Sequence, residues 1–358
     1  MAERRSVYFF AMADDLGRIS RANFEERLRK ALRIDTRYSV LDFKFANGYL
    51  YILTDSVSNA THISQVYRKD PHDFRIKVVL LPDASVGNSI KGICHVGVAP
   101  VRKSANSASE QVTQALYGET FDTLEVKSGW VRIRLHADGY IGWVSSDQVT
   151  LFEDKKFYDF QLHPKVYAAV RVAEILEKPV RTGAAIREVV YGSPLSVSGH
   201  LGKFIEIRMP DGIRGWIDES LVRGSLRPKE SSTEKILVTA RSFRGVSYVW
   251  GGRSAKGFDC SGFVQTVFRL NGVDIPRDAD MQFSAGPGVG KNLKRLREGD
   301  LLFFSYNGDK INHVAIYTGK NKEFIHSSGF VRVNSFDPKR NNFSSKLLST
   351  FVGACRVV

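Results

Sequence analysis

The chain has 358 residues, of which 43% are hydrophobic and 25% are charged, and this composition is typical of a globular protein of two to three domains. No stretch approaches 18 uncharged apolar residues, so the sequence predicts no transmembrane segment, and three widely spaced cysteines do not suggest a disulfide framework. The formal net charge is +14, but no helix-turn-helix, zinc-ligand pattern or dense basic run accompanies it, so we expect no nucleic-acid partner.

The first 83 residues (1–83) have the pattern of a small α+β domain, in which we identify no catalytic constellation. Asn47-Gly48 between two apolar runs predicts a tight hairpin turn. The predicted elements are strands over residues 6–12, 40–45, 50–54 and 74–81, a helix over residues 21–33 and a helix near residues 61–69. His62, His72 and His95 have no metal-ligand spacing with other residues, so we expect no metal site.

The N-terminus carries no long apolar core ahead of an Ala-x-Ala-like site, so the sequence predicts no secretory signal. We therefore expect a cytoplasmic protein. A periplasmic or exported location is the alternative if a leader was removed ahead of the first residue.

Residues 84–228 contain an internal repeat, whose two copies we expect to be domains over residues 84–155 and 156–228. Four short motifs of the first copy recur in the same order in the second. The matched pairs are Pro100-Val101-Arg102 with Pro179-Val180-Arg181, Leu116-Tyr117-Gly118 with Val190-Tyr191-Gly192, Trp130-Val131-Arg132-Ile133 with Phe204-Ile205-Glu206-Ile207, and Asp138-Gly139-Tyr140-Ile141-Gly142-Trp143 with Asp211-Gly212-Ile213-Arg214-Gly215-Trp216. Short alternating strands between Gly-rich turns predict a small all-β barrel for each copy.

In the last third of the chain, a cysteine lies at the start of a predicted helix. Apolar residues after Cys260 follow a helical period as far as the stop signal Asn271-Gly272. Unpaired N–H groups and the helix dipole favour an anion at this position, so we expect a readily ionised, nucleophilic thiol. Cys94 and Cys355 lie among apolar or small residues and are expected to be buried structural thiols, which is also the alternative for Cys260.

Two histidines follow on strands predicted over residues 312–318 and 323–327. A hairpin centred on the Gly319-Lys320 turn would place His313 opposite His326, with their Cβ atoms about 5 Å apart. This pairing suits a histidine base that a second histidine orients, and a one-residue change of register would spoil it. The alternative is a pair of structural strand histidines.

The positive charge is concentrated in the same third of the chain. Residues 233–358 contain nineteen Lys and Arg against ten Asp and Glu, whereas residues 1–83 contain fourteen against eleven and residues 84–232 nineteen against seventeen. Such an excess would help to capture a peptide that bears several carboxylates.

Residues 233–358 carry six short motifs. They are Tyr248-x-Trp250-Gly251-Gly252, Phe258-Asp259-Cys260-Ser261-Gly262, Pro276-Arg277-Asp278 with Gln282, Gly299-Asp300-Leu301, Asn312-His313-Val314-Ala315 and Ile325-His326-Ser327. With these motifs the segment resembles the NlpC/p60 family of cell-wall peptidases, which are papain-like cysteine enzymes. The resemblance implies that Cys260 is the nucleophile, His313 the base and His326 the residue that orients it. It also implies that Tyr248 helps to stabilise the oxyanion, together with the backbone N–H of Cys260.

The two repeats resemble bacterial SH3-like domains, which commonly precede NlpC/p60 domains. This resemblance implies either wall or peptide binding or a packing scaffold. In recycling-type relatives with two such barrels, a tyrosine of the first barrel reaches the cleft and, with acidic residues, holds the free N-terminal amine of the substrate. Tyr140 matches that tyrosine, whereas the second copy has Ile213 at this place.

The same resemblance implies a set of substrate-binding residues. The candidates for holding the ammonium are Tyr140, Glu110, Asp259 and Asp278, those for orienting the substrate are Arg277 and Ser261, and Trp250 is expected in the substrate site. Relatives often have Ser or Thr after the Arg-Asp pair, whereas this chain has Ala279, which lacks the hydroxyl for one contact to the D-glutamate carboxylate.

We therefore expect a multidomain monomer, with a small α+β domain of unknown role, two SH3-like β-barrels and a papain-like α+β catalytic domain, that works without a cofactor. The resemblance implies a cysteine endopeptidase that hydrolyses the γ-D-glutamyl–L-diamino acid bond of peptidoglycan stem peptides, and released peptides with a free N-terminal L-Ala are the expected substrates. One alternative is a lytic endopeptidase that its SH3-like domains anchor to intact wall. Another is a non-catalytic wall-peptide binding module, against which the intact Cys260, His313 and His326 argue.

Overall fold

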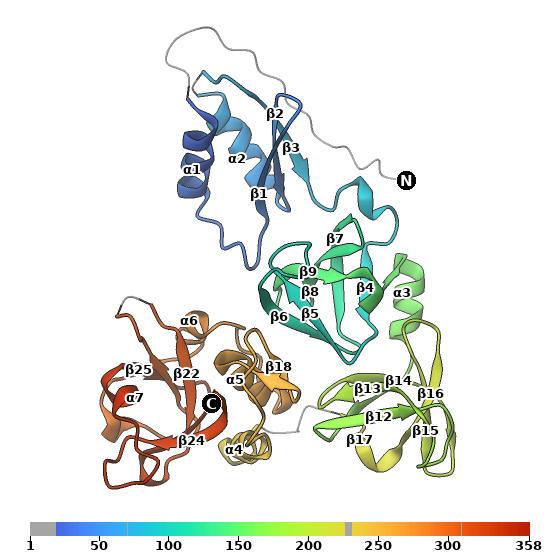
Figure 1. The fold of residues 1–358 in the computed structure, drawn as a ribbon, viewed down its shortest axis with the longest axis vertical. Helices are drawn as coiled ribbons and strands as arrows, with labels where there is room; N and C mark the ends of the chain where they lie inside the picture. The colour runs from blue at the N-terminus through green and yellow to red at the C-terminus, as the bar shows by residue number, and fades with distance from the viewer. Residues whose placement is uncertain (1–18, 70, 226–230, 309) are drawn as a thin grey trace.

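The computed structural model describes residues 19–69, 71–225, 231–308 and 310–358, which form four parts that follow one another along the chain (Figure 1). The strand expected over residues 6–12 lies outside the described residues. None of the helices in the described ranges combines the length and the apolarity that a bilayer crossing requires.

The N-terminal part is a three-stranded sheet with two helices. Its elements are α1 (Arg21–Leu32), β1 (Leu41–Ala46), β2 (Tyr49–Thr54), α2 (Val57–Tyr67) and β3 (Arg75–Leu80), in the sheet order β1-β2-β3. The expected hairpin turn is confirmed, with positive φ at Asn47 and Gly48. The second helix begins earlier than expected, because the Ser56 hydroxyl accepts the N–H of Asn59 and caps the helix there.

The middle of the chain forms two seven-stranded antiparallel sheets. The first contains β4 (Lys91–Cys94), β5 (Val98–Arg102), β6 (Gln111–Leu116), β7 (Thr120–Lys127), β8 (Trp130–Leu135), β9 (Ile141–Ser145) and β10 (Val149–Phe152), in the order β10-β4-β7-β8-β9-β5-β6. The second contains β11 (Lys165–Ala168), β12 (Val172–Leu176), β13 (Ala185–Val190), β14 (Pro194–Leu201), β15 (Phe204–Arg208), β16 (Arg214–Asp218) and β17 (Val222–Arg223), in the order β13-β12-β16-β15-β14-β11-β17. When the strands are matched in chain order, the two sheets have the same neighbours, so the repeat in the sequence is a repeat of structure.

Short helical segments complete the two sheets. They are η1 (Ala84–Val86), η2 (Ser146–Gln148), α3 (Asp154–Gln161), which joins the sheets, and η3 (Glu219–Leu221). The strands follow the expected period of two, since Val131, Ile133 and Leu135 of β8 are all fully buried. Each sheet has a hydrophobic core of its own.

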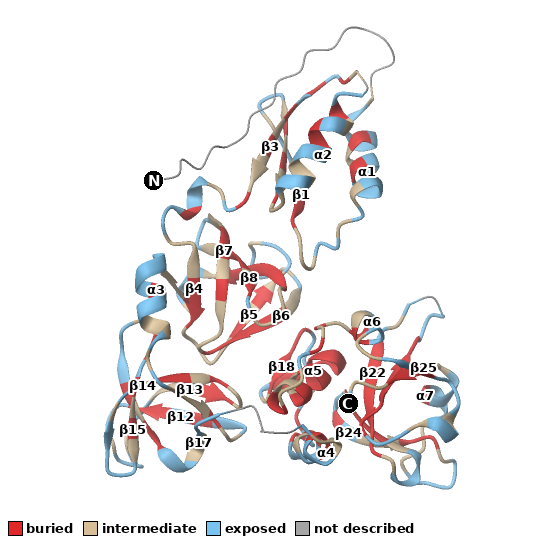
Figure 2. Cartoon of the chain, turned by 180° about the vertical axis from the view of Figure 1, so that it is seen from behind, coloured by how far each residue is buried: buried red, intermediate tan, exposed pale blue. Residues whose placement is uncertain are grey.

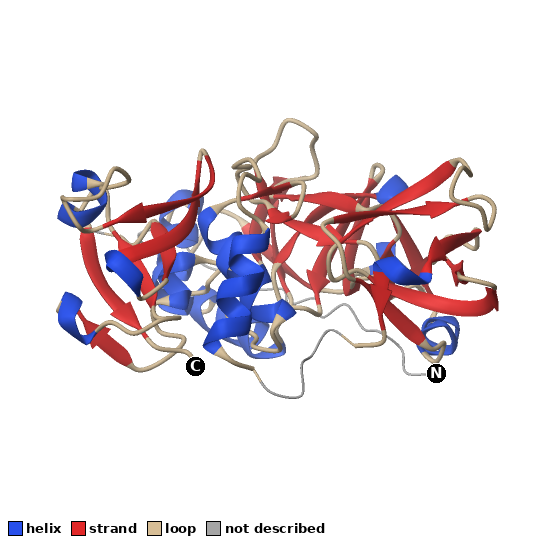
Figure 3. Ribbon diagram, turned by 90° about the horizontal axis from the view of Figure 1, so that it is seen from below, coloured by secondary structure: helices blue, strands red, loops and turns tan. Residues whose placement is uncertain are grey.

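The C-terminal part is a six-stranded antiparallel sheet packed against helices. Its elements are α4 (Thr233–Ser242), β18 (Arg253–Ser254), β19 (Gly257–Phe258), α5 (Cys260–Leu270), α6 (Ala279–Gln282), β20 (Gly288–Gly290), η4 (Leu293–Arg295), β21 (Leu301–Phe304), β22 (His313–Tyr317), η5 (Lys320–Lys322), β23 (Glu323–Ser328), β24 (Phe330–Ser335), α7 (Ser345–Ser349) and β25 (Phe351–Cys355). The sheet order is β20-β25-β21-β22-β23-β24. Figure 3 shows the longest helices of this part between its own sheet and the sheets that precede it, with short helical segments on the outer side of the sheet.

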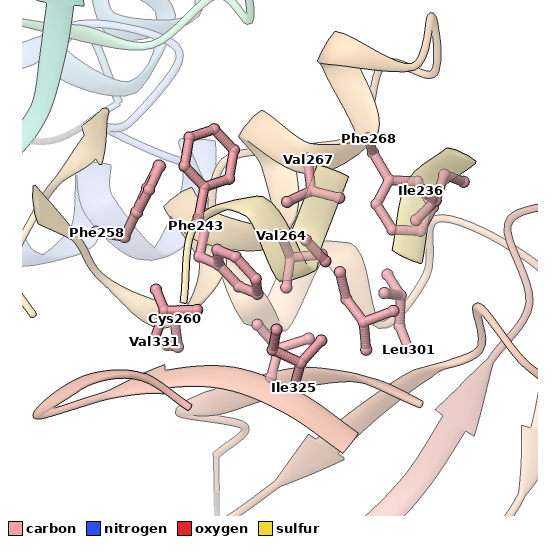
Figure 4. Close-up of a cluster of buried hydrophobic side chains, with 14 of the residues drawn as sticks. Ile236, Phe243, Phe258, Cys260, Val264, Val267, Phe268, Leu301, Ile325 and Val331 are labelled. Atoms are coloured by element: carbon pink, nitrogen blue, oxygen red, sulfur yellow. The ribbon is translucent and has the colours of Figure 1, made fainter. Parts of the chain in front are cut away.

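Helix α5 is the centre of this part and is buried along almost its whole length (Figure 2). Its side chains Val264 and Val267 lie in one core with Leu301 and Ile325 of the sheet (Figure 4). A helix that is apolar on most sides needs packing partners all around it. This packing fixes the N-terminus of α5, and with it Cys260, against strands β22 and β23.

The first seven-stranded sheet lies against both the N-terminal and the C-terminal parts. On one side Arg132 and Arg134 of this sheet form ion pairs with Asp42 and Asp55 of the N-terminal part. On the other side the buried Arg253 pairs with Glu119, a residue of this sheet's β6–β7 turn. The first sheet therefore connects the N-terminal part to the C-terminal part.

Candidate active site

Cys260 is the first residue of α5, as the sequence predicts. The side chain of Asp259 caps the helix, because its Oδ1 accepts the N–H of Gly262 at 2.6 Å. The sulfur lies 3.9 Å from the backbone oxygen of Asn312, the residue that precedes His313. A Cβ at Gly262 would collide with the backbone oxygen of Gly252, so glycine is required where the two segments meet.

The prediction of a readily ionised thiol at Cys260 is wrong. Burial raises the pKa of Cys260 to about 12, and the negative charge of Asp259 adds to the effect. Burial removes water from around the sulfur and thereby disfavours its charged form. The thiol is therefore neutral at rest and needs a base to become a nucleophile.

His313 and His326 lie side by side, with 2.7 Å between His313 Nε2 and His326 Nδ1. The expected register is wrong, because Ile316 pairs with Ile325 and Tyr317 with Phe324, two residues away from the predicted pairing. A shift of two residues keeps every side chain on its face of the sheet. The two imidazoles are therefore diagonal neighbours on one face instead of directly opposite partners.

Two asparagines fix the protonation of the histidine pair. Asn334 Nδ2 donates to the backbone oxygen of Asn342 at 2.9 Å, so Asn334 Oδ1 is the atom 2.9 Å from His326 Nε2. That oxygen can only accept, which places a proton on His326 Nε2 and leaves Nδ1 as an acceptor for His313 Nε2–H. His313 Nδ1 is then the free lone pair that a general base requires.

We expect His313→Ala to lower kcat by roughly 10³-fold, because a general base contributes about 10²–10⁴. His326→Ala should lower kcat by a smaller factor, since His326 holds the base and does not itself take the proton. His326→Asn should have a higher kcat than His326→Ala. Asn334→Ala should lower kcat less than His326→Ala does. Steady-state kinetics of the four variants test this order, and equal losses for His313→Ala and His326→Ala without recovery by Asn would contradict the roles.

The pH profile gives a second expectation for this pair. Burial lowers the pKa of His313 well below 6.5 and that of His326 to about 4. A base with a lowered pKa stays unprotonated to lower pH, so kcat/KM should be nearly constant from pH 7 to pH 6. An ordinary imidazole would lose about two-thirds of its active form over that interval. A fall in kcat/KM on acidification with its midpoint at or above pH 6.5 would contradict the assignment of a buried base with a lowered pKa.

Cys260 opens into a cleft of about 370 Å³. Tyr248 and Trp250 from the segment before α5 line it, and Tyr306 stacks on the ring of His313 at 5.8 Å. Burial and the nearby Cys260 raise the pKa of Tyr248, so its hydroxyl remains a hydrogen-bond donor. A donor beside the nucleophile can stabilise an oxyanion.

The end of the cleft is acidic and is built by the first sheet together with α6. The hydroxyl of Tyr140 donates to Asp278 Oδ2 at 3.2 Å. Glu110 also lines the cleft, and its Oε1 accepts from Trp250 Nε1 at 3.0 Å. The structure thus brings Tyr140, Glu110 and Asp278 to the same cleft as Cys260.

Arg277, a candidate for orienting the substrate, is buried behind the cleft and does not line it. Arg277 is 1% exposed, and its guanidinium donates to Asp259 Oδ2 at 2.6 Å, to Ser261 Oγ at 2.9 Å and to Thr113 Oγ1 at 3.0 Å. Asp259 and Ser261 line the cleft, but Arg277 lies behind them. Because Thr113 belongs to the first sheet, this network also fixes that sheet to the start of α5.

Sequence reasoning missed several residues of the site. They are Arg37, Asp280, Tyr306, Asn312 and Asn334. Asn334 has a signal in the sequence, since it lies on the strand that follows His326 and can pair beside it. Arg37 has none, because 241 residues separate it from Asp278, the carboxylate it binds.

Two family profiles match the chain, NlpC/P60 family over residues 245–351 and bacterial dipeptidyl-peptidase Sh3 domain over residues 101–149. A protein of Bacillus cereus named gamma-D-glutamyl-L-lysine dipeptidyl-peptidase is 30% identical over 62% of this chain and 68% of its own length. The Bacillus subtilis protein of the same name is 46% identical over 28% of this chain and 33% of its own length. Dipeptidyl-peptidase 6 of Lysinibacillus sphaericus is 28% identical over 68% of this chain and 90% of its own length.

Among solved structures, an NlpC/P60 family protein from Bacillus cereus matches with a TM-score of 0.64 and 23% identity over 75% of this chain and 99% of that one. An NlpC/P60 endopeptidase from Photobacterium damselae matches with a TM-score of 0.59 and 16% identity, over 77% of this chain and 75% of that one. At these identities the likeness concerns the fold.

Proposed function

Because the chain belongs to the NlpC/P60 family of cysteine peptidases, we propose that it hydrolyses the γ-D-glutamyl–L-diamino acid bond of peptidoglycan stem peptides. We further propose that it acts on released peptides with a free N-terminal L-Ala. The observation that carries the second part is the hydrogen bond from Tyr140 of the first sheet to Asp278, at the end of the cleft that holds Cys260. Relatives named for the γ-D-glutamyl-L-lysine bond support the first part.

The chemistry begins with two neutral groups. As the Cys260 sulfur attacks the carbonyl carbon of the scissile amide, its proton passes to His313 Nδ1, and the carbonyl π electrons move onto oxygen. The Tyr248 hydroxyl and the backbone N–H of Cys260 stabilise that oxyanion. The C–N bond then breaks, and the proton on His313 goes to the amine of the leaving diamino acid.

A thioester between Cys260 and the glutamyl carbonyl remains. Water attacks it, His313 takes the water proton, and the same two donors stabilise the second oxyanion. Collapse of this intermediate breaks the C–S bond, and the proton returns to sulfur. His326 and Asn334 keep the Nε2–H of His313 in place through both steps, so that Nδ1 is the atom that gains and loses the proton.

The cleft end favours a peptide that stops at a free amine. A primary ammonium can take three acceptors, and Tyr140, Asp278 and Glu110 present oxygens to this end of the cleft. We propose that the two seven-stranded sheets are both SH3-like barrels, that the C-terminal part is papain-like, and that the first barrel serves as a wall of the substrate site. The matched strand order of the two sheets supports the first point.

Product analysis tests the reaction. L-Ala-γ-D-Glu-L-Lys and the corresponding diaminopimelate peptide are incubated with the protein, and mass spectrometry identifies the fragments. Release of the dipeptide L-Ala-D-Glu and the free diamino acid is expected from at least one of them. Cleavage at another bond would rule out the proposed specificity, and so would the absence of any cleavage of both peptides.

A further inference from the structure

The N-terminal part, to which sequence analysis gives no role, places one side chain in the cleft. Arg37 lies on the loop between α1 and β1 and lines the cleft together with Cys260. Its guanidinium donates to Asp278 Oδ2 at 2.9 Å and to the two carboxylate oxygens of Asp280 at 2.8 and 3.0 Å. A residue from outside the catalytic domain and the barrels therefore contacts the acidic end of the substrate site.

Several contacts hold Arg37 in this position. Asp35 accepts from its Nε at 2.9 Å and from its backbone N–H at 3.0 Å. The backbone oxygen of Arg37 accepts from the N–H of Ile141 at 2.7 Å, directly beside Tyr140. The ring of Tyr38 packs edge-on against that of Tyr140, with 5.5 Å between centroids. Arg37 and Tyr140 are thus positioned as one unit.

The arrangement leaves one oxygen of Asp278 for a ligand. Arg37 and Tyr140 both donate to Oδ2, whereas Oδ1 accepts no hydrogen bond from any described residue that lines the cleft. Burial raises the pKa of Asp278, while Arg277 and Arg37 oppose the rise. Without Arg37, this half-buried carboxylate would lose a hydrogen bond to a charged donor and would take up a proton more easily.

The local charge still favours an ammonium. The two guanidinium groups of Arg37 and Arg277 stand against five carboxylates in or beside this end of the cleft. These carboxylates belong to Asp35, Glu110, Asp259, Asp278 and Asp280. Arg37 binds three of these carboxylates, which compensate its positive charge. The carboxylates outnumber the guanidinium groups, so the site as a whole attracts a cation.

We propose that Arg37 is a specificity-determining positioning residue, which holds Asp278 ionised with one oxygen free for the substrate's α-ammonium. The N-terminal part is then a component of the substrate site. This inference rests on the proposed preference for free-amine peptides.

The test compares Arg37→Gln, Arg37→Lys and a matched control, Arg75→Gln, with the unaltered protein. Arg75 is an exposed arginine of β3 in the same N-terminal part, and it is not among the residues that line the cleft. Arg37→Gln should raise KM for a free-amine peptide about tenfold, the effect of weakening one hydrogen bond to a charged group. Its kcat should change less than twofold, because Cys260 and His313 are untouched. Arg37→Lys should recover part of the loss, and Arg75→Gln should behave as the unaltered protein.

The pH dependence separates positioning from a merely structural effect. In Arg37→Gln the pH at which KM begins to rise on acidification should move upward, because Asp278 protonates more easily. Circular dichroism tests whether each variant is folded. If Arg37→Gln does not fold, KM and its pH dependence are measured with Arg37→Lys instead. An unchanged KM and pH profile would overturn the inference, and so would a lower KM, which would mean that Arg37 competes with the ammonium.

The two proposals fail in different ways. If the unaltered protein cleaves free and N-acetylated peptides equally well, there is no ammonium site, and both the proposed preference and the role of Arg37 are overturned. If the unaltered protein discriminates and Arg37→Gln discriminates equally, only the role of Arg37 is overturned.

Discussion

Replacement of Cys260 by alanine should abolish hydrolysis, with kcat falling by about 10⁴-fold or more. The reaction needs a bond between the substrate carbonyl and sulfur, and no other thiol of the chain reaches the cleft. Cys94 and Cys355 are both fully buried, and their sulfurs contact backbone oxygens of Ala115 and Gln282, respectively. Release of diamino acid from a free-amine peptide, followed over hours, measures the loss.

Cys94→Ala and Cys355→Ala are the matched controls and should keep most of the activity. Iodoacetamide should modify Cys260 first, because it is 8% exposed whereas the other two thiols are fully buried. Acidity does not decide this order, since burial raises the pKa of Cys94 to about 12 and that of Cys355 to about 11. Full activity of Cys260→Ala would refute the nucleophile assignment.

Acetylation of the substrate's N-terminal amine should lower kcat/KM by roughly 10⁴-fold. A site built to bond a group rejects an analogue without it by about this factor, because buried polar groups are left unpaired. The acetyl group also adds bulk at the end of the cleft where Tyr140 and Asp278 meet. Intact sacculi, in which muramic acid acylates the N-terminal L-Ala amine of each stem peptide, should be solubilised hardly at all.

Tyr140→Phe should narrow this preference by about 1–3 kcal/mol, because it removes a hydrogen bond to a charged group. Tyr38→Phe is its matched control. The Tyr38 ring packs on Tyr140, but its buried hydroxyl has no hydrogen-bond partner among the residues that the structure describes, so its removal should leave the preference unchanged. Rapid solubilisation of sacculi, or equal rates for the matched free and acetylated peptides, would favour the lytic interpretation.

Local sequence was sufficient for the helix that begins at Cys260 and for placing the two histidines on one face of a sheet. The prediction of a shared face is correct although the predicted register is wrong by two residues, because side chains alternate with a period of two. The raised pKa of the thiol could not be predicted, since it results from burial by residues that are distant in the sequence. The role of Arg37 could not be predicted either, because its contact with Asp278 depends on how the N-terminal part packs against the first sheet and the C-terminal part.

The two seven-stranded sheets have the same strand order, so they differ in what their turns contact and not in their topology. The turn Asp138-Gly139-Tyr140 of the first copy turns outward, with Asp138 accepting from Gln265 of α5 and Tyr140 donating to Asp278. The same turn in the second copy stays within its own sheet, since Asp211 pairs with Arg187 at 2.6 Å and Ile213 is 48% exposed. Of these two turns the first lies at the cleft, so substitutions in it should change peptide recognition, whereas substitutions in the second should change the stability of its own sheet.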